Sequence, residues 1–257
     1  MSKALVWFKR DLRVADHAPL AEATRCDSAL AIFIIEPAWL TSPECHPRHV
    51  SWLLKCLGSL HDALAARGLT LLVRTGAAVE VLAALRHEFA FTQLFSHEET
   101  GPGWSYERDK AVASWCHGSA VAWTEWPQTG VVRRLKNRSG WAARWQQRMD
   151  APRIPVPAGF TAPTDFAPSS WTLALPTLRE LGFSTAPETP PAGEAAGKAT
   201  LASFVSSRSL GYRKHLSSPL TAETGCSRLS EHLAFGTPRL RHTVDAHRAS
   251  SHRKRHS

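Results

Sequence analysis

The sequence predicts an α/β fold in which a doubly wound parallel sheet comes first and an all-helical segment follows. Three observations support this prediction. Short apolar runs alternate with helical periodicity over residues 1–126, a pattern typical of a parallel sheet covered by helices on both faces. Prolines are then concentrated at 151–191, where nine of the seventeen occur. From residue 193 onward the periodicity is helical only.

The strands and helices of the sheet domain follow from the apolar runs and the spacing between them. We expect strands at Ala4–Phe8, Ala29–Ile35, Thr70–Arg74, Gln93–Ser96 and Ala120–Thr124. The intervening segments predict helices at Asp16–Arg25, Arg48–Arg67, Ala77–Phe89 and Ser105–Cys116. In the second helix, apolar residues recur at spacings of three and four from Val50 to Leu64 and therefore line one face, while Gly68 ends the helix.

The proline-rich stretch predicts a boundary between two domains. Proline fixes φ and lacks a backbone donor, so we expect a long irregular connection over the surface, and such a connection usually joins domains. The expected division is an α/β domain at 1–130, a connecting region at 131–192 and the start of a helical domain at 193–257. We expect the helices of 193–236 to pack apart from the sheet.

The chain carries an excess of positive charge that is unevenly distributed. Its 257 residues have a formal net charge of +9, and more than half of this excess lies after Pro238. A second basic cluster, at 133–148, is interleaved with Trp141 and Trp145. This cluster is either a solvated helix face or a phosphate contact.

Several classes of protein are disfavoured by the composition. The five cysteines have no C-x-x-C spacing, which predicts reduced thiols in the cytoplasm and no metal site. No apolar run is long enough to span a bilayer, so no membrane partner is expected. No G-x-x-x-x-G-K-[ST] or G-x-G-x-x-G run follows a strand, which argues against a P-loop enzyme or a dinucleotide dehydrogenase.

A charged loop follows the first strand, at the edge where ligands bind in open α/β sheets. Lys9, Arg10, Asp11 and Arg13 come directly after the apolar run that ends at Phe8, which places them at the carboxyl end of the strand. We expect Asp11 and Arg13 to be structural, fixing the loop through a partly exposed ion pair or through backbone hydrogen bonds. No residue of the chain is assigned a catalytic role.

A second motif lies in the helical segment. Residues 225–230 read GCSRLS and are followed by EHLAFG. Serine hydroxyls and free backbone N–H groups at a helix start suit a phosphate, and an arginine balances its charge. The alternative is that Ser227 and Ser230 only cap a helix that ends at Gly236.

Both motifs resemble segments of the DNA photolyase/cryptochrome family of flavoproteins. The run VWFKRDLRVADHAPL at 6–20 is similar to the opening of that family. Residues 225–236 resemble its flavin-phosphate motif, with Cys226 in place of the usual threonine and Glu231 in place of proline. The resemblance implies that FAD is held at its phosphate end by Tyr212, Cys226, Ser227, Arg228, Leu229 and Ser230.

A third segment also resembles the family. Ser96–Thr100 and Tyr106–Asp109 are similar to the stretch that leads into the pocket of the light-harvesting antenna chromophore, a folate or a deazaflavin. The resemblance implies that Glu98 and Glu99 hydrogen-bond the edge of that ring. The alternative is that these two side chains are exposed and only improve solubility.

The resemblance implies an enzyme that uses FAD and blue light to split cyclobutane pyrimidine dimers in UV-damaged DNA, acting as a cytoplasmic monomer. Family members carry a helical domain about as long as this whole chain, whereas here the sequence ends soon after the first flavin motif. We therefore expect a truncated, inactive form that binds FAD weakly or not at all. The alternatives are a cryptochrome-type blue-light sensor without repair and an α/β antenna or scaffold domain without flavin.

The final stretch, 238–257, is rich in Arg, His and Ser and has little apolar periodicity. Because the family pattern is followed to Gly236 and then lost, this stretch reads either as a basic nucleic-acid tail or as a run encoded out of frame after a truncating change. Low-complexity basic ends of either kind are expected to be disordered.

Overall fold

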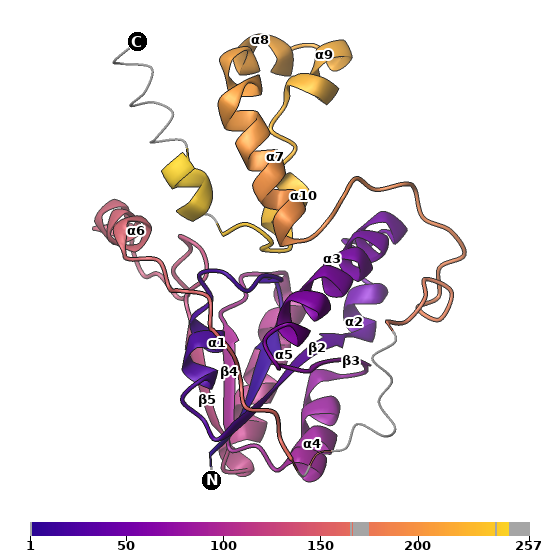
Figure 1. Ribbon diagram of the computed structural model, residues 1–257, viewed down its shortest axis with the longest axis vertical. Coiled ribbons are helices and arrows are strands. Elements are labelled where there is room, and N and C mark those ends of the chain that lie inside the picture. The colour runs from indigo at the N-terminus through magenta and orange to yellow at the C-terminus, as the bar shows by residue number, and fades with distance from the viewer. Residues whose placement is uncertain (1, 165, 167–174, 240, 247–257) are drawn as a thin grey trace.

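A five-stranded parallel sheet forms the centre of the protein, as the computed structural model shows for residues 2–164, 166, 175–239 and 241–246 (Figure 1). The strand order is β3-β2-β1-β4-β5, and every neighbouring pair is parallel. The strands are β1 (Lys3–Phe8), β2 (Ser28–Ile35), β3 (Leu71–Thr75), β4 (Gln93–His97) and β5 (Ala122–Trp126). The predicted doubly wound sheet is therefore confirmed.

The central strand β1 is buried on both faces, because successive side chains of a strand point to opposite sides. Ala4, Val6 and Phe8 belong to one apolar core, and Leu5 and Trp7 belong to the other. Helices cover both faces: α1 (Ala18–Ala23), α2 (Pro37–Leu40), α3 (Pro47–Ala65), α4 (Ala78–Phe89) and α5 (Gly103–Gly118). The predicted apolar face of α3 is buried in the first core, as its 3.6-residue spacing requires.

Two elements begin later than their predicted starts, for local backbone reasons. Asp16 has φ +52°, so α1 begins only after His17, whose side chain accepts a hydrogen bond from the backbone N–H of Leu20. Ala120 also has φ +52°, and the backbone N–H of Val121 donates to an α5 carbonyl. The turn that closes α5 thus occupies the first positions of the predicted last strand.

Over its described residues, 131–164, 166 and 175–192, the connecting region contains one helix, α6 (Trp141–Asp150), and otherwise irregular backbone. In its described part, Phe160 packs against the first core and Phe166 against the second. The backbone N–H of Phe160 donates to the carbonyl of Arg67, 2.9 Å away. The prediction of an irregular connection is confirmed for the described residues. The connection also packs against both faces of the sheet domain.

The segment after residue 193 is helical, as predicted, with α7 (Glu194–Ser206), α8 (Tyr212–Leu216), α9 (Pro219–Gly225) and α10 (Ser230–Ala234), and a short 3₁₀ turn η1 (Arg208–Leu210). The expectation that these helices pack apart from the sheet domain is wrong. A Glu194 carboxylate oxygen accepts from the backbone N–H of Val14 at 2.8 Å, and the N–H of Leu12 donates to the carbonyl of Phe235 at 3.0 Å. Buried backbone donors need acceptors, and the loop after β1 finds them in this segment.

Gly236 lies at this contact and has φ +66°. A Cβ atom there would lie 2.1 Å from the carbonyl oxygen of Arg10, and Arg13 donates to the carbonyl of Gly236 at 2.9 Å. Only glycine combines this backbone conformation with so close an approach.

The segment after Gly236 is more closely integrated than its composition predicted. Arg239 and Arg241 are buried and both pair with Asp16, Arg239 at 2.9 Å. The loss of the family pattern after Gly236 is therefore not a loss of specific contacts. Residues 247–257, on which the prediction of disorder mainly falls, lie outside the described residues. Among the helices that the structure describes, none has the length and apolar character needed to cross a bilayer.

Candidate functional site

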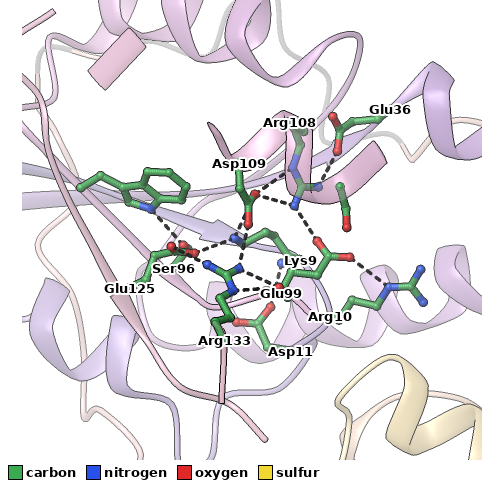
Figure 2. A network of polar contacts seen from close by, with 12 residues as sticks. Lys9, Arg10, Asp11, Glu36, Ser96, Glu99, Arg108, Asp109, Glu125 and Arg133 are labelled. Carbon is green, nitrogen blue, oxygen red and sulfur yellow. Dashed lines mark hydrogen bonds and ion pairs between the residues drawn. The ribbon is translucent and has the colours of Figure 1, made fainter. Parts of the chain in front are cut away.

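The loop after β1 is the meeting point of two buried polar networks. It leaves the sheet at the carboxyl edge between β2 and β4, where ligands of open α/β sheets bind. One network surrounds Asp11, and the other surrounds Arg108 at the start of α5. Figure 2 shows the second network, which links β1, β4 and α5 through charged side chains.

Asp11 is fully buried and accepts three hydrogen bonds. Its donors are the backbone N–H of Lys9 at 2.7 Å, His17 Nε2 at 2.9 Å and His97 Nδ1 at 2.7 Å. Burial acts to raise the pKa of Asp11, but the hydrogen bonds from both histidines outweigh it and hold the pKa well below its ordinary value. Burial lowers the pKa of His17 and lowers that of His97 to about 3. The cluster is therefore one carboxylate and two neutral imidazoles.

These three side chains are of the types that bind metals, and their nearest ligand atoms lie within 4.8 Å of one another. Their hydrogen bonds nevertheless disfavour a cation. His17 Nδ1 accepts from the N–H of Leu20, so its proton is on Nε2, which faces Asp11. His97 likewise presents its Nδ1 proton to Asp11. A cation between them would find no lone pair on His17 unless the cap of α1 were broken, and would find one on His97 only if its proton moved to Nε2, which has no partner among the described residues.

The expectation of a partly exposed Asp11–Arg13 pair is wrong, because both side chains are buried and they do not bond to each other. Arg13 donates instead to the backbone carbonyls of Ala15, Asp16 and Gly236. Backbone hydrogen bonds of the predicted kind are therefore present, and the structural, non-catalytic role of Asp11 and Arg13 stays a prediction. Burial makes these contacts more important to stability than an exposed pair is.

Arg108 is the centre of the second network. Its guanidinium donates to Glu36 and Glu99 at 2.7 Å each and to Asp109 at 2.8 Å, and its cationic carbon lies 4.9 Å from the centre of the Trp7 ring. Burial acts to lower the pKa of Arg108, but the three carboxylates outweigh it and raise the pKa. The Arg108 guanidinium therefore stays charged and is held by three carboxylates and the Trp7 ring.

Lys9 and Arg133 extend the network toward β5. Lys9 Nζ lies 3.1 Å from Glu125 and 3.6 Å from Asp109. Arg133 donates to Glu125 at 2.9 Å and to Asp109 at 2.8 Å (Figure 2). Every buried carboxylate here therefore has at least one cationic partner, as burial of charge requires.

This network lines a pocket that contains one of the two predicted antenna residues. Glu99 lines it together with Trp7, Trp104 and Arg108, and both Glu98 and Glu99 line an adjacent cleft with a cavity volume of about 440 Å³. Glu99 is not an exposed solubilising residue, because its side chain is 5 % exposed and paired with Arg108. The sequence indicated the segment that contains Arg108. It could not identify Arg108 as the central cation of the network, because the direction in which this side chain points depends on the position of α5.

The pocket is small. Its cavity measures about 40 Å³ for the centres of water molecules, and one water needs roughly 10–15 Å³ on that measure. It therefore admits a few waters, and a folate or deazaflavin ring does not fit while Arg108 bridges Glu36 and Glu99.

Of the predicted flavin-phosphate residues, only Arg228 lines a larger cleft between the helical segment and the connecting region. The cleft has a cavity volume of about 670 Å³. Tyr212 does not line it and packs instead on Phe204, with ring centres 5.5 Å apart. Ser227 Oγ accepts from the N–H of Leu229 at 3.5 Å, but Leu229 is the N-cap of α10 and no described side chain caps this helix, so the alternative that Ser227 and Ser230 cap it is not supported.

The charges of this cleft are mostly neutralised within the chain. Arg48 pairs with Glu231 at 2.8 Å, and Arg228 pairs with Glu223 at 3.2 Å. Arg208, which sequence reasoning missed, differs: it donates to the carbonyls of Cys226 and Thr200 and to Ser203 Oγ, and has no carboxylate partner among the described residues. A phosphate near residue 226 therefore has one uncompensated guanidinium available.

Comparison with known proteins places these features in a family. The family model "DNA photolyase" matches residues 4–140. A deoxyribodipyrimidine photo-lyase of Halobacterium salinarum is 30 % identical over 96 % of this chain and 54 % of its own length. An uncharacterised 31.6 kDa protein of Synechococcus is 29 % identical over 92 % of this chain and 86 % of its own length.

Solved structures share the fold over nearly all of the chain. A bacterial class III photolyase from Agrobacterium tumefaciens superposes with TM-score 0.77 and 22 % identity, over 96 % of this chain and 53 % of that one. A Synechocystis cryptochrome superposes with TM-score 0.79 and 18 % identity, over 98 % and 56 %. Most of this chain matches these photolyases and this cryptochrome. The match covers only about half of their own length. Because the family model matches more than half of its residues, the chain belongs to the DNA photolyase family.

Proposed function

We propose that this chain supplies the α/β domain and the phosphate end of an FAD site of a photolyase-type flavoprotein, whose complete site repairs pyrimidine dimers in UV-damaged DNA. The observation that carries this proposal is the cleft beside residues 226–230 with Arg208 at its edge. A guanidinium without a carboxylate partner favours a phosphate ligand. When bound, FAD supplies the light-driven electron transfer.

The residues present fit the phosphate end of FAD better than its ring. Arg208 would hold a phosphate oxygen, aided by backbone N–H groups of residues 227–230, and Arg228 joins only if it leaves Glu223. The lining of the cleft contains no aromatic ring other than His232. The walls that would bury the isoalloxazine are therefore not among the described residues.

We further propose that the 257-residue chain by itself binds FAD weakly and repairs no DNA. A few charge-assisted hydrogen bonds contribute about 1.5–3 kcal/mol each, whereas association costs about 4–15 kcal/mol in lost freedom alone. A phosphate subsite without an isoalloxazine wall leaves little net affinity.

Titration of the purified chain with FAD, followed by flavin fluorescence, tests the site. Binding should be weak, should disappear in Arg208→Gln and should persist in part in Arg208→Lys, which keeps the charge. Arg179→Gln removes an exposed cation outside the cleft and is the matched control. Equal affinity of wild type and Arg208→Gln would contradict the assignment of Arg208.

Illumination with dimer-containing DNA tests the second part of the proposal. We expect no restored thymines above a no-protein control. Stoichiometric, tightly held FAD or light-dependent repair by the chain would contradict it.

A further inference from the structure

A surface on the connecting region carries positive charge without any acidic residue. We call it the basic surface; it comprises Arg134, Lys136, Arg138, Arg144 and Arg148. No Asp or Glu occurs between residues 127 and 149. Figure 1 shows that this part of the chain, with α6, stands at the margin of the sheet domain.

The cations of the basic surface differ from their neighbour Arg133. That residue turns inward and is neutralised by Glu125 and Asp109. Lys136 and Arg138 are exposed, and their side chains have no hydrogen bond or ion pair among the described residues. Arg144 and Arg148 donate only to backbone carbonyls, of Ser139 at 3.1 Å and of the 129–131 loop. Carbonyl acceptors leave a guanidinium charge uncompensated.

The basic surface is also held in place. Trp141 Nε1 donates to the carbonyl of Gly130 at 3.1 Å, and Trp145 lies so close to Gly130 that a Cβ there would be 2.3 Å from its ring. Trp141 and Trp145 occupy positions i and i+4 of α6, with ring centres 6.5 Å apart, so both rings reach the 129–131 loop from one helix face. The helix that carries Arg144 and Arg148 is thus fixed against the 129–131 loop, which reduces the ordering cost of binding there.

We propose that the basic surface binds the phosphate backbone of DNA. Five like charges within fifteen residues repel one another, and a polyanion relieves that repulsion while releasing its counterions. The contact is to phosphates, so it is independent of base sequence and of a lesion. It does not depend on the flavin cleft, and it is measured in the dark on undamaged DNA.

The test compares variants of the full chain for binding of a fluorescein-labelled, undamaged DNA duplex by anisotropy at several salt concentrations. The test variant is Lys136→Gln/Arg138→Gln, since neither side chain has a hydrogen bond or ion pair among the described residues. The matched control is Arg25→Gln/Arg179→Gln, which removes two exposed cations elsewhere. A third variant, Arg253→Gln/Arg255→Gln, reports on the basic end of the sequence.

Loss of two phosphate contacts should reduce the slope of log affinity against log salt by about 1.8 and weaken binding near 0.1 M salt by about tenfold or more. The control double variant should keep the wild-type slope. The proposal is overturned if the wild type fails to bind DNA at low salt. It is also overturned if the control variant weakens binding as much as the test variant does, or if Arg253→Gln/Arg255→Gln alone weakens binding. Binding of polyglutamate but not of DNA would likewise overturn it, assigning the surface to an acidic protein.

Discussion

Asp11 shows that burial changes the structural role of a charged residue in a loop. The sequence suggested that the Asp11 carboxylate forms a weak surface ion pair. In the structure this carboxylate is out of contact with water and accepts three hydrogen bonds. Its removal leaves a backbone N–H and two imidazole N–H groups without acceptors. The cost of an unsatisfied buried group, and not the strength of any one bond, governs stability here.

Asp11→Ala should therefore lower the free energy of unfolding by about 3 kcal/mol or more, because three buried N–H groups lose their acceptor at about 1–3 kcal/mol each. Urea denaturation followed by circular dichroism measures this. Asp62→Ala is the control, because the Asp62 side chain is 86 % exposed beside His61 and its loss should cost little. Similar destabilisation by both substitutions would contradict the burial argument.

The lowered pKa values of His17 and His97 predict that acid destabilises the protein. The unfolded chain takes up protons near pH 6.5, while folded His97 does so only at about 3. Between these values the unfolded state binds more protons, so stability present above pH 6.5 is lost as the pH falls. For His97 alone the slope reaches about 1.4 kcal/mol per pH unit. The lowered pKa of Asp11 acts in the same direction at lower pH.

Urea midpoints measured between pH 7 and 5 check this expectation. In His97→Asn, whose side-chain amide can still donate to Asp11, the pH dependence should be flatter. His87→Asn, an exposed position, should leave the dependence unchanged. A wild-type midpoint that rises on acidification would show that the histidines are not held neutral.

At the scale of elements, the loop after β1 is a connector as well as a turn. Its left-handed residue, Asp16, receives the backbone N–H of Ile154 from the connecting region and the guanidiniums of Arg239 and Arg241 from beyond the helical segment. Three separate stretches of chain thus meet at one carboxylate. Burial acts to raise the pKa of Asp16, but the hydrogen bond from Arg241 and the other contacts lower it.

Asp16→Asn removes the charge and keeps a residue that tolerates positive φ. Two buried guanidiniums then lack their anion, so the free energy of unfolding should fall by about 3–5 kcal/mol. Trypsin cleavage within 193–246 should also become faster. Asp245→Asn breaks the exposed Arg153–Asp245 pair and should have an effect of at most about 1 kcal/mol. Equal protease resistance of Asp16→Asn and wild type would argue against the anchoring role.

At the scale of the whole molecule, burial is unequal between the two parts of the chain. The sheet domain has two filled cores, whereas η1 and the short helices α8 and α9 expose large apolar side chains. Leu220 is 92 % exposed, Leu210 71 % and Leu216 54 %. Apolar surface of this kind promotes association when nothing covers it.

Leu216→Glu/Leu220→Glu should therefore reduce self-association, measured by light scattering across a concentration series, and leave the melting temperature nearly unchanged. Leu201→Glu is the contrasting variant, since Leu201 is 7 % exposed and a charge there should lower the melting temperature. Unchanged association of the double variant would show that these leucines do not cause it.

Most of the sheet domain could be predicted from the amino-acid sequence. Periodicity is a local property, and the alternation of apolar runs with a 3.6-residue spacing predicted five strands and the covering helices close to their observed positions. The short helix α2 was not predicted, and the other errors were at ends such as those near Ala120 and Asp16, where a positive φ that no pattern reports shifts the boundary. The two motifs also indicated the family, because their residue order is visible without a structure.

Only the tertiary structure decided which charged side chains meet. Asp11 and His97 are far apart in sequence, as are Glu36 and Arg108, and Asp16 and Arg241. No periodicity encodes these pairings, because they depend on the order of strands in the sheet and on where the helical segment docks. The same limit explains why Glu99 could not be separated from Glu98, and why Arg208 went unnoticed: a local pattern specifies an element, whereas burial and charge pairing depend on what the rest of the chain places against it.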